Sequence, residues 1–342
     1  MSRPHFSVLI AARDEAATLP LLLAALACQT LPPAQFEVII IDDHSTDATA
    51  DIVRRAAQTS PFRLRLLRLA GQPGQPTGKK AALAAALAQA RAPWIVCTDA
   101  DCRPGPGWLA AYAAARRRWP AARFISGPVL LTETSSLLQK LVGLEFAGLV
   151  GVGAATLAAG RPTMCNGANL AYHLDTFRAV GGFAGNELIA SGDDEFLLHK
   201  IEAAFPGFAH FLAEPAAIVR TAAPPTLRAL LRQRVRWASK WRHYQSAAPR
   251  RLALLVLAAN LALGAALLVA LFRPALWPWT AAAWALKLGA DAWFLWPVLG
   301  FFGRRRWLAL VPLLQLAYGP YALGVGLAGL RGGYEWKGRA VR

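Results

Sequence analysis

The chain has 342 residues, a net charge of +17 and a mean hydropathy of +0.33, and 55% of its residues are hydrophobic. Its four cysteines form no C-x-x-C pair, so we expect neither a disulfide framework nor a zinc site. The basic residues cluster directly before an apolar run, which favours anionic lipid headgroups and argues against a nucleic-acid partner. This cluster consists of Arg228, Arg232, Arg234, Arg236, Lys240, Arg242, Arg250 and Arg251.

Residues 6–131 alternate short apolar runs with stretches rich in Ala and Leu. The runs predict strands at 6–12, 36–41, 63–69 and 94–98, and the stretches predict helices at 15–28, 47–58, 79–90 and 107–118. This alternation predicts an α/β fold with a mainly parallel sheet and helices on both of its faces. The first run is too short for a signal peptide, so we expect this domain in the cytoplasm.

Residues 141–160 form an apolar stretch that only Glu145 interrupts. The stretch is long enough to cross a bilayer. A single crossing there would place the acidic motifs at 99–101 and 193–194 on opposite sides of the membrane. We therefore predict an interfacial or core helix.

Three later apolar segments, at about 252–272, 275–302 and 307–330, predict a membrane domain at 249–342 that follows an α/β domain at 1–248. Lys287 and Asp291 lie at i and i+4, which predicts a structural ion pair rather than a transport site. Three crossings would leave the basic tail outside the cell, against the positive-inside rule. Whether 307–330 crosses therefore stays open, as does the side on which the C-terminus lies.

Acidic side chains follow two of the predicted strands. Asp99 and Asp101 follow 94–98, and at i and i+2 of an extended chain their carboxylates point to the same side. Asp43 follows 36–41 in the same way. The carboxyl ends of strands border the ligand crevice of α/β sheets, where carboxylates can hold a divalent metal or a nucleotide. Taken singly, a D-x-D motif is usually a polar turn, and the run at 41–47 is equally well explained as a capped loop.

Gly78, Lys79 and Lys80 open a predicted helix after a loop rich in Gly and Pro. A lysine beside the free N–H groups of a helix N-terminus suits a phosphate. The simpler interpretation of the two lysines alone is a solvated pair.

Two motifs in the second half of the chain suit an acceptor site. Small residues at Gly167–Asn169 would let a sugar or acceptor approach the backbone closely, although a tight turn explains them equally well. Asp193 and Asp194 precede a helix predicted at 195–204. Like charges this close raise the pKa of at least one of them, which suits a general base.

Gln233, Arg236 and Trp237 lie at i, i+3 and i+4 of another predicted helix and therefore share a face. An indole can stack on a sugar ring and a guanidinium can meet a diphosphate. The alternative is an amphipathic helix on a membrane surface.

Taken together and in this order, the motifs make the chain resemble the membrane-bound enzymes of glycosyltransferase family 2, which invert the sugar and have the GT-A fold. The resemblance covers residues 6–245. It rests on Gly78–Leu83, Asp99–Asp101, Gly167–Ala171, the Asp193-Asp194 pair and the Q-x-x-R-W signature at 233–237. The chain departs from the family pattern at Ala84, where asparagine is usual, and at Asp193, where the pair is commonly Glu-Asp.

The resemblance implies roles for individual residues. Asp194 would be the catalytic base, and Asp101 would hold Mg²⁺ or Mn²⁺. The nucleotide-sugar site would consist of Asp43, Lys79, Asp99, Asp101 and Arg236. The acceptor site would consist of Gly167, Asn169, Asp193, Gln233 and Trp237.

The implied activity is transfer of a sugar from a nucleotide-diphosphate sugar, with UDP favoured, to a lipid or lipid-linked acceptor. The implied location is the cytoplasmic face of the inner membrane, with several crossings. The alternatives are a processive polysaccharide synthase, a non-catalytic subunit, and a transporter that uses Lys287 and Asp291. The sugar, the nucleotide base, the acceptor and the oligomeric state stay open.

Overall fold

The structure is a computed structural model that describes residues 3–69, 77–132, 136–187, 189, 191–240, 246–331, 334–336 and 339–341. The chain divides into two compact units. The first unit contains residues 1–130 and 153–222, and the second contains residues 131–152 and 223–342.

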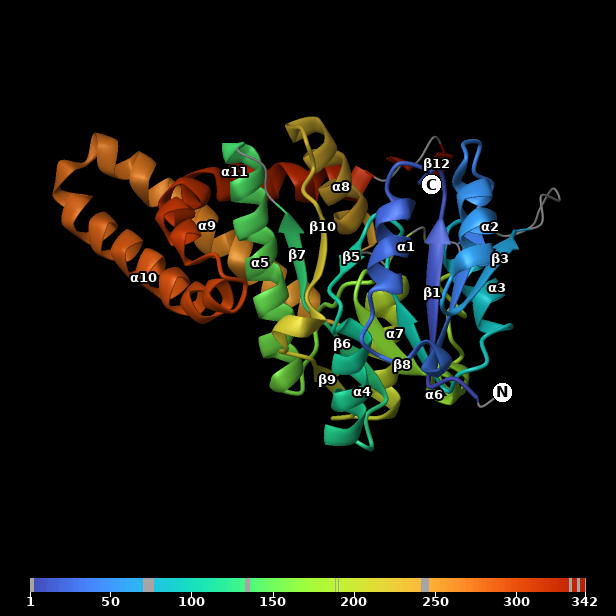
Figure 1. Ribbon diagram of the computed structural model, residues 1–342. Coiled ribbons are helices and arrows are strands. Elements are labelled where there is room, and N and C mark those ends of the chain that lie inside the picture. The colour runs from blue at the N-terminus through green and yellow to red at the C-terminus, as the bar shows by residue number, and fades with distance from the viewer. Residues whose placement is uncertain are drawn as a thin grey trace. The chain divides into compact units, whose positions relative to one another are not determined.

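The first unit is an α/β domain built on a seven-stranded sheet of order β3-β2-β1-β4-β8-β6-β9 (Figure 1). Its strands are β1 (Phe6–Ala12), β2 (Phe36–Asp42), β3 (Arg63–Arg68), β4 (Trp94–Cys97), β6 (Phe124–Ser126), β8 (Leu170–His173) and β9 (Ala209–Phe211). A second sheet has the order β5-β10-β7, with β5 (Arg103–Pro104), β7 (Val129–Thr132) and β10 (Val219–Ala222). The helices of the first unit are α1 (Leu19–Ala27), α2 (Thr49–Thr59), α3 (Lys79–Leu87), α4 (Trp108–Arg118), α6 (Leu174–Ala179) and α7 (Asp193–Ala204).

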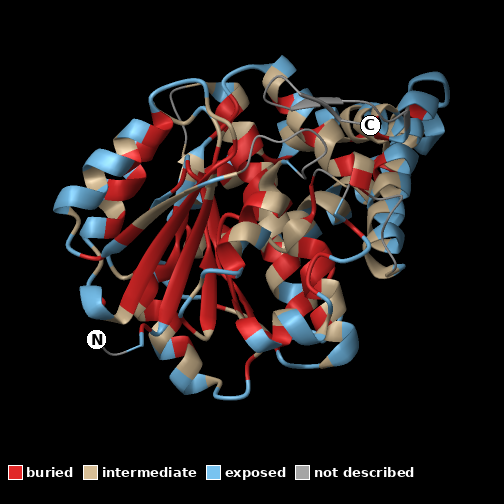
Figure 2. Cartoon of the chain, turned by 90° about the vertical axis from the view of Figure 1, so that its right-hand side faces the viewer, coloured by how far each residue is buried: buried red, intermediate tan, exposed pale blue. Residues whose placement is uncertain are grey.

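The predicted mainly parallel sheet is confirmed. β1 pairs in parallel with β2 and β4, and β2 pairs in parallel with β3, whereas β8 runs antiparallel to its neighbours β4 and β6. Every residue of β2 and β4 is buried, because helices cover both faces of the sheet (Figure 2).

The register of the sheet brings the acidic strand ends to one edge. Ala12 at the end of β1 lies opposite Asp42 at the end of β2, and Leu9 lies opposite Cys97 at the end of β4. Asp43 directly follows β2, and Asp99 comes two residues after the end of β4. Both residues therefore lie at the carboxyl edge of the sheet.

Three helices of the first unit begin two or more residues away from their predicted starts, and one of them, α2, begins at Thr49 rather than at residue 47. α1 begins at Leu19 rather than at residue 15, because Pro20 lacks an N–H group and is tolerated only in a first turn. α7 begins at Asp193, two residues earlier than predicted, because Gly192 adopts the left-handed conformation and supplies the N-cap.

The second unit is helical. It contains most of α5 (Leu137–Ala158), together with α8 (Leu227–Ser239), α9 (Ala248–Phe272), α10 (Trp277–Phe301) and α11 (Val311–Arg331). A hairpin of β11 (Tyr334–Trp336) and β12 (Arg339–Val341) follows. The predicted boundary at residue 248 is not where the compact units divide, because 131–152 and 223–247 group with the later helices.

Within the described residues, three helices are long and apolar enough to cross a membrane, namely residues 137–158, 248–272 and 305–330. The segments predicted at 252–272 and 307–330 are therefore supported as candidates. α10 forms as a helix but is not among the three, and it carries Lys287 and Asp291. The predicted pair exists, since Lys287 Nζ donates to Asp291 Oδ2, and Gln315 on α11 donates to the same oxygen.

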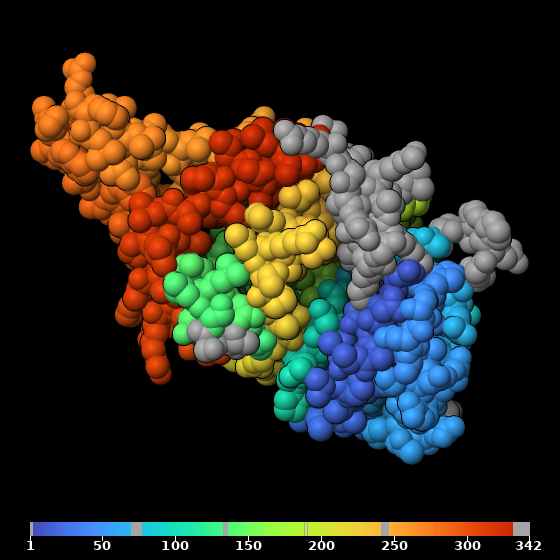
Figure 3. Space-filling view, turned by 90° about the horizontal axis from the view of Figure 1, so that it is seen from above, coloured from blue at the N-terminus to red at the C-terminus, as the bar shows by residue number. Residues whose placement is uncertain are grey.

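A charged cluster explains why α5 belongs to the second unit. Glu145 on α5 accepts a hydrogen bond from Arg234 on α8 at 2.7 Å and another from Tyr321 on α11 at 3.1 Å. Arg234 and Glu145 keep only 5% and 10% of their side chains exposed. In Figure 3 these three segments lie side by side in green, yellow and red. The one charge that interrupts the apolar stretch 141–160 is thus a partner for α8.

Candidate active site

Asp43 connects the end of β2 to the start of α3. Its carboxylate is buried, and Oδ2 accepts the backbone N–H of Gly78 at 3.0 Å. Oδ1 lies 3.0 Å from His44 Nδ1, and His44 has a positive φ of 60°. A non-glycine residue in that region is a strained feature that concentrates at functional sites.

Lys79, the first residue of α3, lies among three acids. Its Nζ is 2.6 Å from Asp99 Oδ1 and 3.4 Å from Asp193 Oδ2. Burial by itself would lower the pKa of Lys79, but Asp193, Asp99 and Asp194 together raise the pKa well above its usual value. The interpretation as a solvated lysine pair is wrong for Lys79. Its ammonium contacts Asp99, which follows β4, and Asp193, which begins α7.

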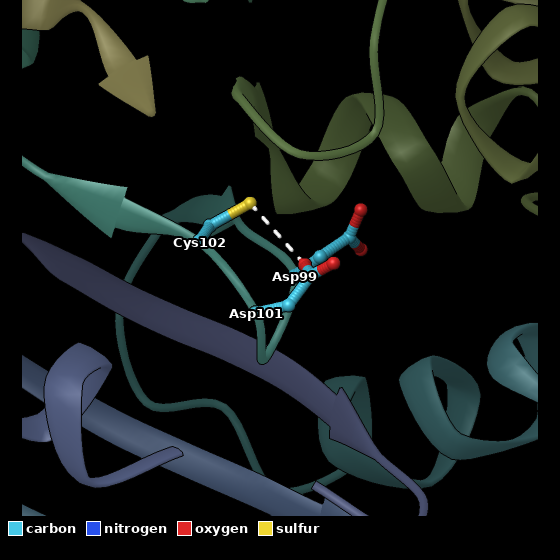
Figure 4. A group of neighbouring side chains, drawn as sticks. All are labelled: Asp99, Asp101 and Cys102. Atoms are coloured by element: carbon cyan, nitrogen blue, oxygen red, sulfur yellow. Dashed lines mark hydrogen bonds between the residues drawn. The ribbon is translucent and has the colours of Figure 1, made fainter. Parts of the chain in front are cut away.

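Asp99 and Asp101 lie with Cys102 in the turn between β4 and β5 (Figure 4), and their ligand atoms lie within 4.8 Å of one another. Cys102 Sγ is 3.6 Å from Asp101 Oδ1. Burial and the two carboxylates raise the pKa of the Cys102 thiol, so it stays protonated and is a poor ligand. Asp99 is already paired with Lys79, whereas Asp101 is exposed. The donor set therefore suits a hard, oxygen-binding cation, with Asp101 the available carboxylate.

Asp194 is fixed by two backbone amides. Its Oδ2 accepts the N–H of Gly167 at 2.7 Å, and its Oδ1 accepts the N–H of Glu195 at 2.8 Å. A side chain at Gly167 would place its Cβ 2.9 Å from Lys79 Nζ and 3.3 Å from Asp193 Oδ2. A side chain at Gly167 would therefore have to displace the ends of these charged side chains, whereas the predicted approach of a sugar or acceptor to this backbone stays a prediction.

The pKa of Asp193 is raised above its usual value. Burial is the largest cause and the charge of Asp194 adds to it, while Lys79 acts in the opposite direction. The prediction that at least one of the two adjacent acids has a raised pKa is thus supported by Asp193.

Asn169 has no hydrogen-bonding capacity left for a ligand. Its Nδ2 donates to the carbonyl oxygens of Pro128 and Ala217, each at 2.8 Å. Its Oδ1 accepts from Trp108 Nε1 and Tyr112 Oη, also at 2.8 Å. Both donors and both lone pairs of the amide are engaged. The side chain is fully buried, so its observed position holds the loop that carries Gly167.

Gln233, Arg236 and Trp237 lie on α8, in the second unit. Arg234, between them, donates to Gln233 Oε1 at 2.9 Å and lies 4.3 Å from the centre of the Trp237 ring. The sequence placed Arg234 among the basic residues that favour lipid headgroups, which is wrong for this residue, because its side chain is buried and pairs with Glu145. One signal could have predicted its pairing with Glu145. Arg234 is a basic residue close to a tryptophan in a helix, and Glu145 is the one acid in a distant apolar stretch.

The first unit thus brings Asp43, Lys79, Asp99, Gly167, Asp193 and Asp194 into one continuous set of contacts. Residues 94–320, well over half of the chain, match the family model described as glycosyl transferase family group 2. Residues 7–120 match the model described as glycosyl transferase family 2. The chain belongs to glycosyltransferase family 2.

Curated relatives of this family 2 glycosyltransferase are poly-beta-1,6-N-acetyl-D-glucosamine synthases. The Staphylococcus epidermidis protein is 24% identical over 68% of this chain and 53% of its own length. The protein from Staphylococcus aureus strain COL is 26% identical over 59% of this chain and 46% of its own length. The chain therefore spans about half the length of these relatives.

Solved structures show the same fold. The mannosyltransferase PcManGT from Pyrobaculum calidifontis, solved with GDP-Man and Mn²⁺, matches 95% of this chain and 88% of its own, with a TM-score of 0.57 and 24% identity. S. aureus TarS 1-349 with UDP-GlcNAc matches 98% and 95%, with a TM-score of 0.50 and 16% identity. The glycosyltransferase therefore has the predicted GT-A fold.

Proposed function

We propose that this enzyme transfers a sugar from a UDP-sugar, with inversion, to a lipid or lipid-linked acceptor. The observation that carries the proposal is the position of Lys79, whose ammonium lies between Asp99 of the D-x-D motif and Asp193 of the acidic pair. A donor-binding group and a proton-accepting group thereby meet in one site.

The residues proposed to bind the nucleotide sugar are Asp43, Lys79, Asp99, Asp101 and Arg236. Lys79 offers its positive charge to a diphosphate beside the N-terminus of α3. Asp101 would hold Mg²⁺ or Mn²⁺, which neutralises charge on a departing diphosphate when bound. The Mn²⁺ and GDP-Man in PcManGT and the UDP-GlcNAc in TarS support both assignments.

Asp194 is the proposed catalytic base. The amides of Gly167 and Glu195 fix the orientation of its carboxylate, which is a proton acceptor when ionised. Asp194 takes the hydroxyl proton while the oxygen attacks the anomeric carbon from the face opposite the leaving diphosphate. Gly167 and Asp193 would border the acceptor next to Asp194.

The remaining acceptor residues have less direct roles. Asn169 acts by holding the loop of Gly167, because its amide is fully engaged within the first unit. Gln233 and Trp237 would contact the acceptor from α8.

The enzyme is proposed to work at the cytoplasmic face of the inner membrane. α9 and the segment 305–330 are apolar enough to cross a bilayer, and Arg250 and Arg251 at the start of α9 suit anionic headgroups. This location would give the site access to a lipid-linked acceptor.

A donor screen tests the proposal. The purified chain in detergent, with a bacterial lipid extract as acceptor, is incubated with UDP- and GDP-sugars, and nucleotide release is followed with and without Mn²⁺. We expect release from one UDP-sugar that depends on the lipid and falls to background with EDTA. An Asp101→Asn variant should lose the Mn²⁺ response. Release from no donor, or release independent of metal, would contradict the proposal.

A second candidate is a processive polysaccharide synthase, which the curated relatives favour. Product length separates the two functions. Mass spectrometry of the extracted product would show one added sugar for simple transfer and a ladder of sugars for processive synthesis.

A further inference from the structure

Lys80 follows Lys79 directly, but its side chain is used differently. Only 6% of Lys80 is exposed. Its Nζ donates to the backbone carbonyls of Asn186 at 2.6 Å and Ile189 at 2.8 Å, and it lies 5.1 Å from the centre of the Phe196 ring. Two carbonyls and an aromatic face therefore solvate the ammonium in place of water.

The groups that surround Lys80 belong to the part of the chain that leads to the acidic pair. Asn186 and Ile189 precede Gly192, whose φ of 81° turns the backbone into α7. Phe196 lies in the first turn and a half of α7, directly after the acids. Lys80 thus contacts the chain on both sides of Asp193 and Asp194.

The two lysines of α3 therefore act on two sides of one site. Lys79 contacts the strand-end acid Asp99 and the helix-start acid Asp193, while Lys80 holds the backbone that delivers the helix start. Burying an ammonium costs free energy that an apolar side chain of the same volume would not. A lysine here is accordingly better explained by the geometry it imposes than by stability.

We propose that Lys80 is a positioning residue, which fixes the acidic pair Asp193-Asp194 relative to the donor-binding strand ends. The proposal rests on the proposed function in one respect, namely that Asp194 is the base. A displacement of about 1 Å in a reacting group can lower a rate by about a hundredfold, so the orientation of this segment matters for turnover.

Lys200 on α7 provides a matched control. Its Nζ donates to the carbonyls of Gly182 at 2.8 Å and Ala184 at 2.6 Å, which lie earlier in the same connection. Lys200→Met removes the same kind of bonds from the same connection without touching the residues next to the acids.

The test compares Lys80→Met, Lys80→Arg and Lys200→Met in the full-length protein. We expect Lys80→Met to lower kcat by about tenfold to a hundredfold, with the Kd for UDP changed less than about twofold. Hydrogen exchange should accelerate over residues 183–196 in this variant. Lys200→Met should keep wild-type kcat and accelerate exchange only around 178–186. Lys80→Arg keeps the charge but not the geometry, and we expect intermediate kcat.

Two outcomes would overturn the proposal. One is wild-type kcat and unchanged exchange over 183–196 in Lys80→Met. The other is an equal loss of kcat in Lys200→Met, which would show a general effect of destabilising the connection. If Lys80→Met does not fold, wild-type kcat in Lys80→Arg would overturn it. Hydrogen exchange needs no turnover, so a failure of the proposed transferase activity is distinguishable from a failure of this inference.

Discussion

At the scale of single residues, Lys79 is the group on which the site depends most. Its ammonium separates the carboxylates of Asp99 and Asp193, which would otherwise face one another in a partly desolvated site. A diphosphate can replace or share these contacts, because it also carries negative charge and strong acceptors.

Lys79→Met should weaken UDP binding by about 2 kcal/mol, which is roughly thirtyfold in Kd. The variant removes the charged donor and leaves carboxylates that repel the diphosphate. Isothermal titration calorimetry with UDP and Mn²⁺ measures the effect. Arg54→Met, which breaks an exposed ion pair with Asp51 on α2, is the control and should bind UDP normally. Equal affinity in Lys79→Met would contradict the donor role.

The sequence predicted which residues gather in the site better than it predicted what each one contacts. Asp99, Gly167 and Asp194 converge as motif order suggested, because strand ends and helix starts in an α/β sheet share an edge. The contacts of Lys80 and Asn169 could not be predicted. Both depend on carbonyl oxygens distant in the chain, and backbone groups carry no signal in the sequence.

At the scale of elements, the loop before β8 is held by one side chain. Asn169 joins Pro128, Ala217, Trp108 and Tyr112, which come from three separate segments, the last two from α4. Gly127 leaves room for it, since a Cβ there would lie 2.4 Å from Asn169 Nδ2.

Asn169→Leu should lower the apparent free energy of unfolding by about 3 kcal/mol, because the substitution leaves buried donors and acceptors unpaired. Asn166→Ala, which loses a single bond to the Ala168 N–H, should cost about 1 kcal/mol or less. Thermal and urea unfolding in detergent give both values. Similar losses in the two variants would show that Asn169 does not hold the loop.

The cluster on α5, α8 and α11 makes a second prediction about elements. Glu145→Gln and Arg234→Met should each destabilise the protein by about 3 kcal/mol or more, because each leaves a buried charge without its partner. The double variant should lose less than the sum, and unfolding of all four proteins gives the coupling energy. Additive losses would mean that the pair is not coupled.

Strand positions were predicted more closely than helix ends. β1 matches its predicted range, and β2, β3 and β4 match within one residue, since continuous apolar runs mark buried parallel strands. The short strands β5 to β10 have two to four residues each, too few for a periodic pattern to identify them. The helix starts at Leu19 and Asp193 depend on Pro20 and Gly192, which the predicted ranges did not use.

At the scale of the whole molecule, the sequence predicted an α/β domain and apolar helices, but not how the segments group. The chain folds into two compact units whose residues interleave along the sequence. The ion pair that joins α5 to α8 spans 89 positions, a distance at which hydropathy carries no pairing information. The alternation of strands and helices, in contrast, is local and could be predicted.

The central claim is that this family 2 glycosyltransferase uses Asp194 as the base for sugar transfer. Asp194→Asn tests it most directly, because asparagine can still accept the Gly167 N–H but cannot take a proton. Transfer to the acceptor should fall by about a hundredfold to ten-thousandfold, with UDP affinity unchanged. Asp175→Asn, an exposed acid on α6, should leave transfer unaffected. Near-normal turnover in Asp194→Asn would contradict the account.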